Sequence, residues 1–499
     1  MADNNEAIKK CRNNIEALLS QKGHAGLRET SYPSRSLNFL QRVNKRWPQR
    51  RPPFQAHCQP PPQEDLPLQA KVKLNIVVAG AGLGGLATAI ALRRRGHAVT
   101  VFEKAPELGE VGAGIQVPPN SSRLLLKWGL GPYLGGKAIE PHAIRMRRWQ
   151  NGEVLSLTKL LPDFRDRFGA PYYVVHRANL QLAMHKLALD LGVEVKVSSG
   201  VNRYDAETPS VGLEDGSVYQ ADLVVAADGI KSEARKVVLD GEDQPPKKAG
   251  FAAYRAMVDA EMMRGDPDVS WLLESPGQNL WLGDQRHVMT YTIAGGKSFN
   301  MVLSHPEDSD PATWNQATVI EDMKRHFEGW DPRRLVKVIS MIRTTLKWPL
   351  LSGKCLRKWV STSGKLLILG DAAHPMVPYM SEGAAMAVED GAALAEILSL
   401  LDSKSQLHSA LQIFERVRLL RAGQMQEASL VNGKLWHFAD GPEQRARDEA
   451  MRPEVEEREF EESPNQWSDP VTAAWAYGYD AEEEVRKAFI ENQSRNAKL

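Results

Sequence analysis

The sequence has few cysteines, almost no net charge and no long apolar run. Its three cysteines, Cys11, Cys58 and Cys355, lie far apart, so they predict neither a disulfide framework nor a metal site, and a reducing, cytoplasmic compartment is expected. The 63 Lys and Arg nearly balance the 62 Asp and Glu, which favours neither nucleic acid nor a membrane surface as a partner. No apolar run approaches the roughly 18 residues of a spanning helix, so no transmembrane segment is expected.

The chain is long enough for two domains, or for one large domain with a small satellite. Of its 499 residues, 42% are hydrophobic and 25% are charged, which is typical of globular proteins. Residues 1–73 carry 13 Lys and Arg against 6 Asp and Glu. We expect them to form a disordered N-terminal extension; a transit peptide and a mis-assigned start codon are the alternatives.

The most informative stretch runs from a buried strand through a glycine turn into a helix and a second strand. Its first apolar run is too short for a helix and is rich in β-branched residues. In order, the stretch contains strand 76–79, the turn Gly80-x-Gly82-x-x-Gly85, helix 83–95, strand 99–102 and the acid Glu103. This combination predicts a dinucleotide-binding unit, which the glycine motif alone would not.

Each residue of the motif has a mechanical reason. Gly80 allows the tight turn out of the strand, Gly82 lets the backbone approach a pyrophosphate, and Gly85 lets the helix pack closely on the sheet. The helix N-terminus offers unpaired N–H groups to the phosphates. Glu103 lies 18 residues after Gly85, where an acid hydrogen-bonds a ribose hydroxyl.

Two later strands end on an aspartate beside a glycine. The pairs are Asp228-Gly229 and, after the apolar run 366–369, Gly370-Asp371. A long Ala-rich helix then begins at Gly383, so a second helix N-terminus points at the same ligand site. Taken alone, each pair is an ordinary strand-to-helix turn.

Residues 250–349 have a different pattern from the rest of the chain. Short alternating segments predict a mixed or antiparallel sheet rather than βαβ units, and residues 139–173 are also β-rich. Tyr254, Arg255 and Tyr291 lie on expected strands of this substrate region. Such residues on a sheet are commonly structural.

A loop and a helix start complete the candidates. The small residues from Gly112 to Gly114 suit close backbone approach to a flat ligand, and Gln116 belongs to the same stretch. Arg177 stands where a helix begins, a position that the helix dipole disfavours for a cation. It therefore contacts either a ligand or a salt-bridge partner.

Three motifs in fixed order resemble the class A flavoprotein monooxygenases. They are the glycine motif with Glu103, then Asp228-Gly229, then Gly370-Asp371. The stretches 112–115, 253–255 and 370–375 resemble the salicylate hydroxylase-like branch of the para-hydroxybenzoate hydroxylase family. The similarity covers about residues 73–480.

The resemblance implies an α/β fold with a Rossmann-type, glutathione-reductase-like FAD-binding domain. The domain is expected in two parts, 74–249 (with the β-rich insertion near 139–173) and 350–439, around the inserted β-sheet substrate region 250–349. Long helices end the second part. Residues 440–499 form an acidic tail, with 16 Asp and Glu against 8 Lys and Arg, and its four aromatic anchors predict that it docks. The anchors are Trp467, Trp475, Tyr477 and Tyr479.

The resemblance also assigns roles to individual residues. The FAD-binding positions are Gly80, Gly82, Gly85, Glu103, Gly114, Gln116, Arg177, Asp228, Gly229, Asp371, Gly383 and Ala384. Arg255 and Tyr291 resemble an Arg and a Tyr that hold a substrate as its phenolate, and they are the catalytic candidates. Tyr254 and Pro378 are the candidates for substrate contact, and no metal is expected.

The activity implied is hydroxylation of a phenolic or hydroxybenzoate-type aromatic compound. NADH or NADPH reduces the FAD, and O2 is carried as the flavin C4a-hydroperoxide. A polyketide-derived ring, a role in secondary metabolism and oxidative decarboxylation all remain open, as does a monomer or a homodimer. The alternatives are a flavin epoxidase or oxidoreductase of the same fold on a non-aromatic or polycyclic substrate, and a flavin-binding protein that has lost catalysis.

One residue departs from the family pattern. Glu382 stands where many members of the family have Gln, immediately before the helix that begins at Gly383. A carboxylate beside the flavin opposes the anionic reduced ring unless its side chain points away. The sequence therefore leaves the geometry of this loop open.

Overall fold

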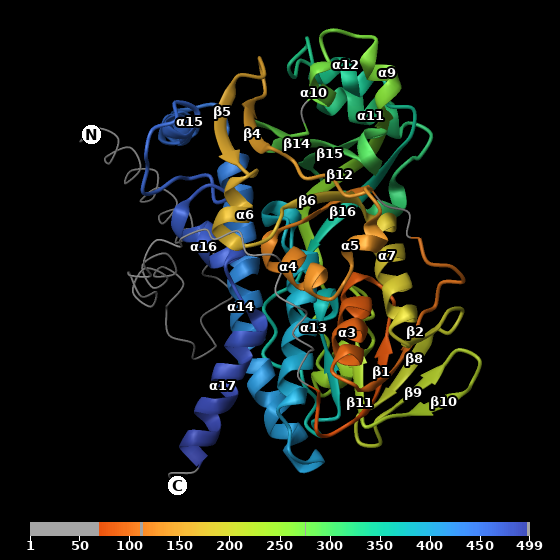
Figure 1. The fold of residues 1–499 in the computed structure, drawn as a ribbon. Coiled ribbons are helices and arrows are strands. Elements are labelled where there is room, and N and C mark those ends of the chain that lie inside the picture. Colours follow the sequence, from red (N-terminus) through yellow and green to blue (C-terminus); the bar gives the residue numbers. More distant parts are fainter. Residues whose placement is uncertain (1–68, 110–112, 275, 497–499) are drawn as a thin grey trace.

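The computed structural model describes residues 69–109, 113–274 and 276–496. Residues 1–68 of the expected extension lie outside this part, as do Gly112 and residues 497–499 of the tail. Figure 1 shows a parallel sheet in the lower half of the molecule, a second large sheet in the upper half, and long C-terminal helices along one side.

A five-stranded parallel sheet carries the dinucleotide motif. Its central strands are buried apolar runs, as expected where helices cover both faces. In spatial order the strands are β17 (Leu366–Ile368), β11 (Leu223–Ala226), β1 (Asn75–Ala79), β2 (Ala98–Phe102) and β7 (Glu194–Lys196). The helix α3 (Leu83–Arg94) packs against both α7 (Arg177–Asp190) and α13 (Gly383–Ser399). All the strands are parallel, so their carboxyl ends meet at one edge of the sheet.

Smaller elements surround this sheet. A two-stranded sheet consists of β3 (Gly114–Val117) and β6 (Tyr173–His176), and a three-stranded one of β8 (Val201–Asp205), β9 (Ser210–Leu213) and β10 (Val218–Gln220). The short helices are α4 (Pro119–Lys127), α5 (Gly131–Leu134), α6 (Asp163–Phe168) and α8 (Ala234–Val238).

The second large sheet has seven strands and combines two distant parts of the sequence. In order they are β16 (Thr345–Ser352), β12 (Lys247–Asp259), β15 (Ser298–Pro306), β14 (Arg286–Ile293), β13 (Gln278–Gly283), β4 (Ala143–Arg148) and β5 (Val154–Lys159). Only the pairing of β13 with β4 is parallel among them. The β-rich insertion near 139–173 therefore belongs in space to the sheet of residues 250–349.

The two faces of this sheet have different surroundings. The inner face, which carries Ala253, Met289 and Tyr291, packs against the segment 377–380 and against α13. The outer face, which carries Tyr254 and Val288, is covered by four helices. These are α9 (Ala260–Arg264), α10 (Trp271–Glu274), α11 (Val319–His326) and α12 (Leu335–Ser340).

The C-terminal residues form four helices that pack on the rest of the protein. They are α14 (Leu407–Trp436), α15 (Pro442–Val455), α16 (Pro470–Tyr477) and α17 (Ala481–Asn496). Trp467 and Tyr477 are buried, and Trp475 and Tyr479 each lie under the guanidinium of Arg421. The prediction that the tail docks is confirmed.

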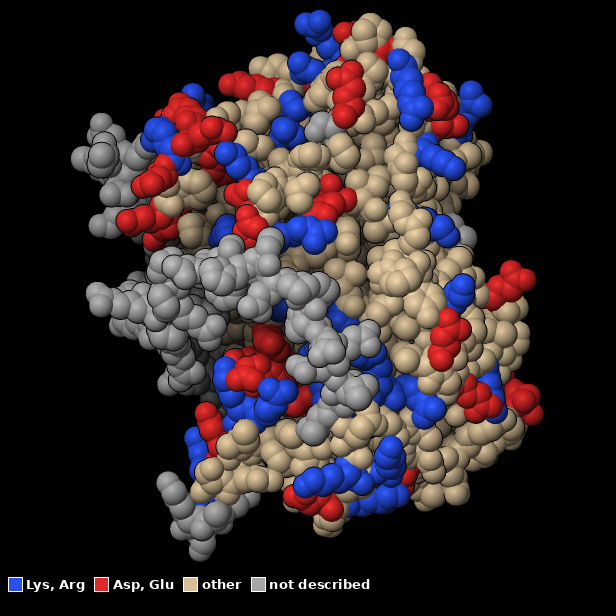
Figure 2. All heavy atoms as spheres, in the orientation of Figure 1, with Lys and Arg blue, Asp and Glu red and all other residues tan. Residues whose placement is uncertain are grey.

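Positive and negative side chains are interspersed on the surface. On the described part of the face in Figure 2, Lys and Arg are interspersed with Asp and Glu, and acidic side chains gather near α15. No helix within the described ranges has the length and apolar character needed to cross a membrane.

Candidate active site

Close contacts require two of the three glycines of the first motif, Gly80 and Gly85. Gly80 has a φ of +102°, and a Cβ atom there would lie 2.5 Å from the carbonyl oxygen of Ala227. A Cβ on Gly85 would lie 1.9 Å from the carbonyl oxygen of Gly80. A Cβ on Gly82 would meet nothing within 4 Å, so this glycine borders open space at the start of α3. The turn therefore leaves room for a ligand at Gly82 only.

The surroundings of this turn suit a nucleotide. No side chain caps the N-terminus of α3 and its first turn contains no acid, so its N–H groups are available to a phosphate. Glu103 accepts hydrogen bonds from the backbone N–H groups of Ala81 and Ala105, each at 2.8 Å. These bonds fix its carboxylate at the end of β2, beside the glycine turn.

The two aspartates follow β11 and β17 at the same edge of the sheet. Asp228 Oδ2 accepts hydrogen bonds from the Tyr204 hydroxyl at 2.9 Å and from the N–H of Glu233 at 3.2 Å, while its Oδ1 is buried without a partner. Gly229 has a φ of +80°. Asp371 is exposed, and the guanidinium of Arg235 bonds to the carbonyl of the next residue. An unpartnered buried acceptor and an exposed carboxylate fit a ligand rich in hydroxyl groups.

The start of α13 lies between this edge and the inner face of the second sheet. No side chain caps the helix, and Gly383 and Ala384 are only partly buried, so their N–H groups can reach a ligand. Pro378 is exposed in a short 3-10 turn (Pro378–Met380) before the helix. The neighbouring Val377 and Met380 pack in the same apolar cluster as Tyr291.

A row of polar side chains crosses the inner face. The strand register places Tyr291 between Gln278 on one side and Asn300 on the other. Both polar ends of Gln278 and the Nδ2 of Asn300 are buried without hydrogen-bond partners. Because unpartnered buried polar atoms are costly, such a cluster marks a place where a polar ligand binds.

The β3 strand closes this row. The N–H of Gly114 donates to Asn300 Oδ1 at 2.7 Å, and a Cβ on Gly114 would lie 2.4 Å from Cε2 of Tyr291. Gln116 Oε1 accepts a hydrogen bond from the Tyr172 hydroxyl at 2.5 Å. Gly114 is therefore needed for the close approach of the Tyr291 ring.

Arg255, Tyr291 and Arg177 are electrostatically coupled. Burial raises the pKa of Tyr291 well above its usual value, and the charge of Arg255 opposes this shift. Burial lowers the pKa of Arg255; Tyr291 opposes the change, and Arg177 adds to it. The Nε of Arg255 is buried without a partner. The inner face thus holds a desolvated cation beside a neutral phenol.

Comparison with known proteins identifies the family. The family model described as an FAD binding domain matches residues 73–429. The FAD-dependent monooxygenase OpS4 of Beauveria bassiana (strain ARSEF 2860) is 37% identical over 410 residues, covering 82% of this chain and 95% of the relative. The 3-hydroxybenzoate 6-hydroxylase of Polaromonas naphthalenivorans (strain CJ2) is 30% identical over 411 residues, covering 82% and 96%. The chain belongs to the FAD-dependent class A flavoprotein monooxygenases.

Solved structures of other monooxygenases have the same fold. A salicylate hydroxylase in complex with its substrate has a TM-score of 0.67 and 25% sequence identity, over 84% of this chain and 98% of the other. CtdE in complex with FAD and a substrate has a TM-score of 0.72 and 26% identity, over 86% and 100%. The α/β fold class expected from the sequence is confirmed.

The residues described above fit FAD. The open space at Gly82 suits the pyrophosphate, Glu103 the ribose, Asp371 the ribityl chain and the amides of Gly383 and Ala384 the isoalloxazine. The geometry brings Gly114, Arg177, Arg255 and Tyr291 to the sheet face that packs against the α13 segment.

Tyr254 is not brought to this site. It lies on the outer face, where its ring stacks on His305 at 4.8 Å and lies under Lys347 Nζ at 5.5 Å. Successive residues of a strand point to opposite faces, so Tyr254 and its neighbour Arg255 cannot share one pocket. The structure thus corrects the prediction that Tyr254 contacts the substrate.

Sequence reasoning missed Gln278 and Asn300. Both stand on alternating strands at positions that share a face with Tyr291. Because side chains alternate between the two faces of a sheet, the pairing of the strands would have shown that Gln278 and Asn300 lie on the same face as Tyr291. The pairing of β13, β14 and β15 was the missing information.

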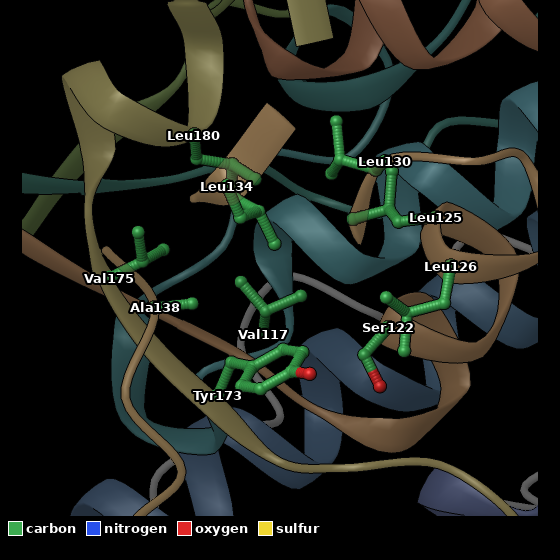
Figure 3. A pocket seen from close by; sticks show the side chains of 10 residues that line it. All are labelled: Val117, Ser122, Leu125, Leu126, Leu130, Leu134, Ala138, Tyr173, Val175 and Leu180. Carbon is green, nitrogen blue, oxygen red and sulfur yellow. The ribbon is translucent and has the colours of Figure 1, made fainter. Parts of the chain in front are cut away.

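A small cavity elsewhere in the monooxygenase has no such polar character. Figure 3 shows side chains from β3, β6, α4, α5 and α7 around it, including Val117, Leu134 and Leu180. Its volume is about 10 Å³, room for about one water molecule. The Ser122 hydroxyl at its edge already donates to the carbonyl of Pro171. We assign no ligand to it.

Alanine substitutions at Gly85 and at Gly82 should have different effects on stability and on FAD binding. We expect Gly85→Ala to lower the melting temperature of the FAD-free protein and to abolish FAD binding, because its methyl group collides with the Gly80 carbonyl. Gly82→Ala should leave that melting temperature unchanged, because the methyl group meets no protein atom within 4 Å. It should weaken FAD binding about 10- to 100-fold if the pyrophosphate lies at this glycine. Thermal unfolding and FAD titration measure both; equal melting temperatures for the two variants would contradict the expectation.

Proposed function

We propose that this monooxygenase consumes NADH or NADPH and O2 and hydroxylates a phenolic or hydroxybenzoate-type aromatic substrate. The observation that carries the proposal is a buried sheet face on which Arg255 and Tyr291 influence each other electrostatically, beside unpartnered polar atoms of Gln278 and Asn300. Relatives named 3-hydroxybenzoate 6-hydroxylase and 3-amino-4-hydroxybenzoate 2-monooxygenase support this substrate class.

The chain's own groups have three tasks in this proposal. Bound FAD supplies the electron transfer from NAD(P)H and the activation of O2. Arg255, being cationic and desolvated, favours the ionised phenolate over the phenol, and the Tyr291 hydroxyl hydrogen-bonds to the same oxygen. A phenolate ring is more nucleophilic than a phenol ring. The apolar contacts of Val377 and Met380 with the inner face exclude water from the reacting atoms.

The test is NAD(P)H oxidation by the purified flavoprotein across a panel of phenols and hydroxybenzoates. H2O2 and organic product are followed together, with NADH and NADPH compared. We expect one substrate class to accelerate oxidation and to give hydroxylated product with little H2O2. Acceleration of oxidation with H2O2 as the only product for every panel member would overturn the substrate class and direct the search to polycyclic compounds.

A further inference from the structure

Four carboxylates are buried on α13 or directly before it, and one of them has no cation. Glu396 is paired with Arg95 and, at 2.7 Å, with Arg486. Glu389 is paired with Arg418 at 2.8 Å and with Arg421 at 3.0 Å. Asp390 is paired with Arg418 at 2.8 Å and with His374 at 2.6 Å. Glu382 is 1% exposed, and no basic group of the described chain forms an ion pair with it. An unpaired buried carboxylate is strongly disfavoured.

Within the described residues, the hydrogen bond from Asn120 to the Glu382 carboxylate shows where a proton belongs. Asn120 Nδ2 donates to Glu382 Oε2 at 2.9 Å and to Glu389 Oε1 at 2.7 Å. The second carboxylate oxygen of Glu382, Oε1, and the amide oxygen of Asn120, Oδ1, are both buried without a hydrogen-bond partner. Two unpartnered acceptors on an already bonded pair need a donor, and a proton on Glu382 converts one acceptor into that donor.

We propose that Glu382 is an uncharged carboxylic acid in the folded monooxygenase, and that its proton keeps the start of α13 free of negative charge for the reduced flavin. The groups facing Glu382 are Glu389 on its own helix, Arg421 on α14, Asn120 on α4, and the phenols of Tyr172 and Tyr477. Burial and, to a smaller extent, the charge of Glu389 raise the pKa of Glu382 to about 8, although Arg421 and the hydrogen bond from Asn120 oppose the shift.

The proton matters because of where Glu382 stands. It precedes the first residue of α13, whose N–H groups and positive dipole end favour an anion. An ionised carboxylate at this position would cancel that charge and repel a reduced, anionic flavin. The neutral acid leaves the positive end of the helix dipole uncompensated. This role depends on the proposed contact between the flavin and the start of α13; the protonation itself does not.

The first test is the stability of the FAD-free protein as a function of pH. A carboxyl group whose pKa is raised on folding destabilises the protein progressively as pH rises from about 4.5 to about 8. Glu382→Gln keeps the shape and remains neutral. We therefore expect the melting temperature of the variant to be close to that of the wild-type protein at pH 5. As the pH rises to 8, the melting temperature of the variant should exceed that of the wild type by an increasing amount. A constant difference in melting temperature from pH 5 to pH 9 would overturn the protonation.

The second test concerns the bound flavin. In the wild-type protein, ionisation of Glu382 should weaken the binding of reduced FAD about tenfold more than the binding of oxidised FAD. In Glu382→Gln, the ratio of the two affinities should not change in this way. Reduction potentials of the bound flavin from pH 6 to pH 9.5 measure this ratio. The matched control is Glu454→Gln, a second buried Glu with a raised pKa that lies in α15 against β5. The reduction potential of the flavin bound to Glu454→Gln should have the same pH dependence as in the wild-type protein.

The outcomes separate the two parts of the inference. Melting curves that diverge with pH, combined with diverging potentials, support both parts. Diverging melting curves with parallel potentials would overturn the role toward the flavin and leave the protonation established. If Glu454→Gln changes the potentials as Glu382→Gln does, the coupling is general and the assignment to Glu382 fails.

Discussion

We expect Arg255→Ala to lower hydroxylation by about 100- to 1,000-fold while FAD remains bound. The side chain is the desolvated cation next to Tyr291, and its Nε is buried without a partner. Without it, the phenolate loses its counter-charge, so the effect should be larger at low pH than at high pH, where the free phenol ionises unaided. Turnover of the true substrate between pH 6 and pH 10, together with flavin absorbance, measures both effects.

The neighbouring residue provides the matched control. Tyr254→Phe removes a hydroxyl group from the same strand but on the outer face, so turnover should stay within about twofold of wild type. Arg255→Lys keeps the charge and should recover part of the lost rate. Turnover of Arg255→Ala near that of wild type would show that the substrate lies elsewhere.

Arg418→Met should destabilise the protein by about 3–5 kcal/mol. The guanidinium is fully buried and donates to Asp390, to Glu389 and to the carbonyl of Met386. Burial tends to raise the pKa of Asp390, but His374 and Arg418 hold it at about 2. Removing the guanidinium leaves these carboxylates undercompensated in the interior. Equilibrium unfolding in urea measures the loss.

The size of this effect depends on burial rather than on the number of ion pairs. Arg452 forms an exposed pair with Glu449, with side chains 55% and 48% exposed. Arg452→Ala should therefore change stability by less than about 1 kcal/mol. Similar losses for the two variants would contradict the buried network. Added salt should weaken the Arg452 pair and have little effect on the Arg418 network.

The cofactor edge of the fold was predictable because its signals are local. Gly80, Gly82 and Gly85 lie within one turn, and their spacing together with the flanking strand and helix can be read from the sequence alone. The contact of Gly85 is with the turn itself, whereas that of Gly80 is with Ala227, just after the neighbouring strand β11. Asp228 and Asp371 each follow an apolar run that can only be a buried strand. The mixed sheet of the substrate region was likewise predicted from alternation.

The remainder depends on pairings between distant segments. Arg255 and Tyr254 are adjacent in sequence, and only the pairing of β12 with β15 decides which one reaches the inner face. Gly114 was assigned to a flat ligand, and the structure adds the Tyr291 ring, from another strand 177 residues later, as its close neighbour. Asn120, which lies 262 residues before Glu382, donates a hydrogen bond to its carboxylate. The periodicity of hydrophobic residues within a segment does not indicate which distant segments come into contact.

The strand order of the parallel sheet also affects how the protein is made. β1 and β11 are synthesised early, whereas β17 and the covering helix α13 come from residues 366–399. At roughly 5–20 residues per second, the ribosome needs roughly 15–60 s to pass from β1 to β17. During that interval the outer edge of β11 and one side of α3 are uncovered, while the seven-stranded sheet can begin to form. The contact between α13 and α3 can therefore form only after residue 399 has been made, and a site that includes the start of α13 cannot be complete before then.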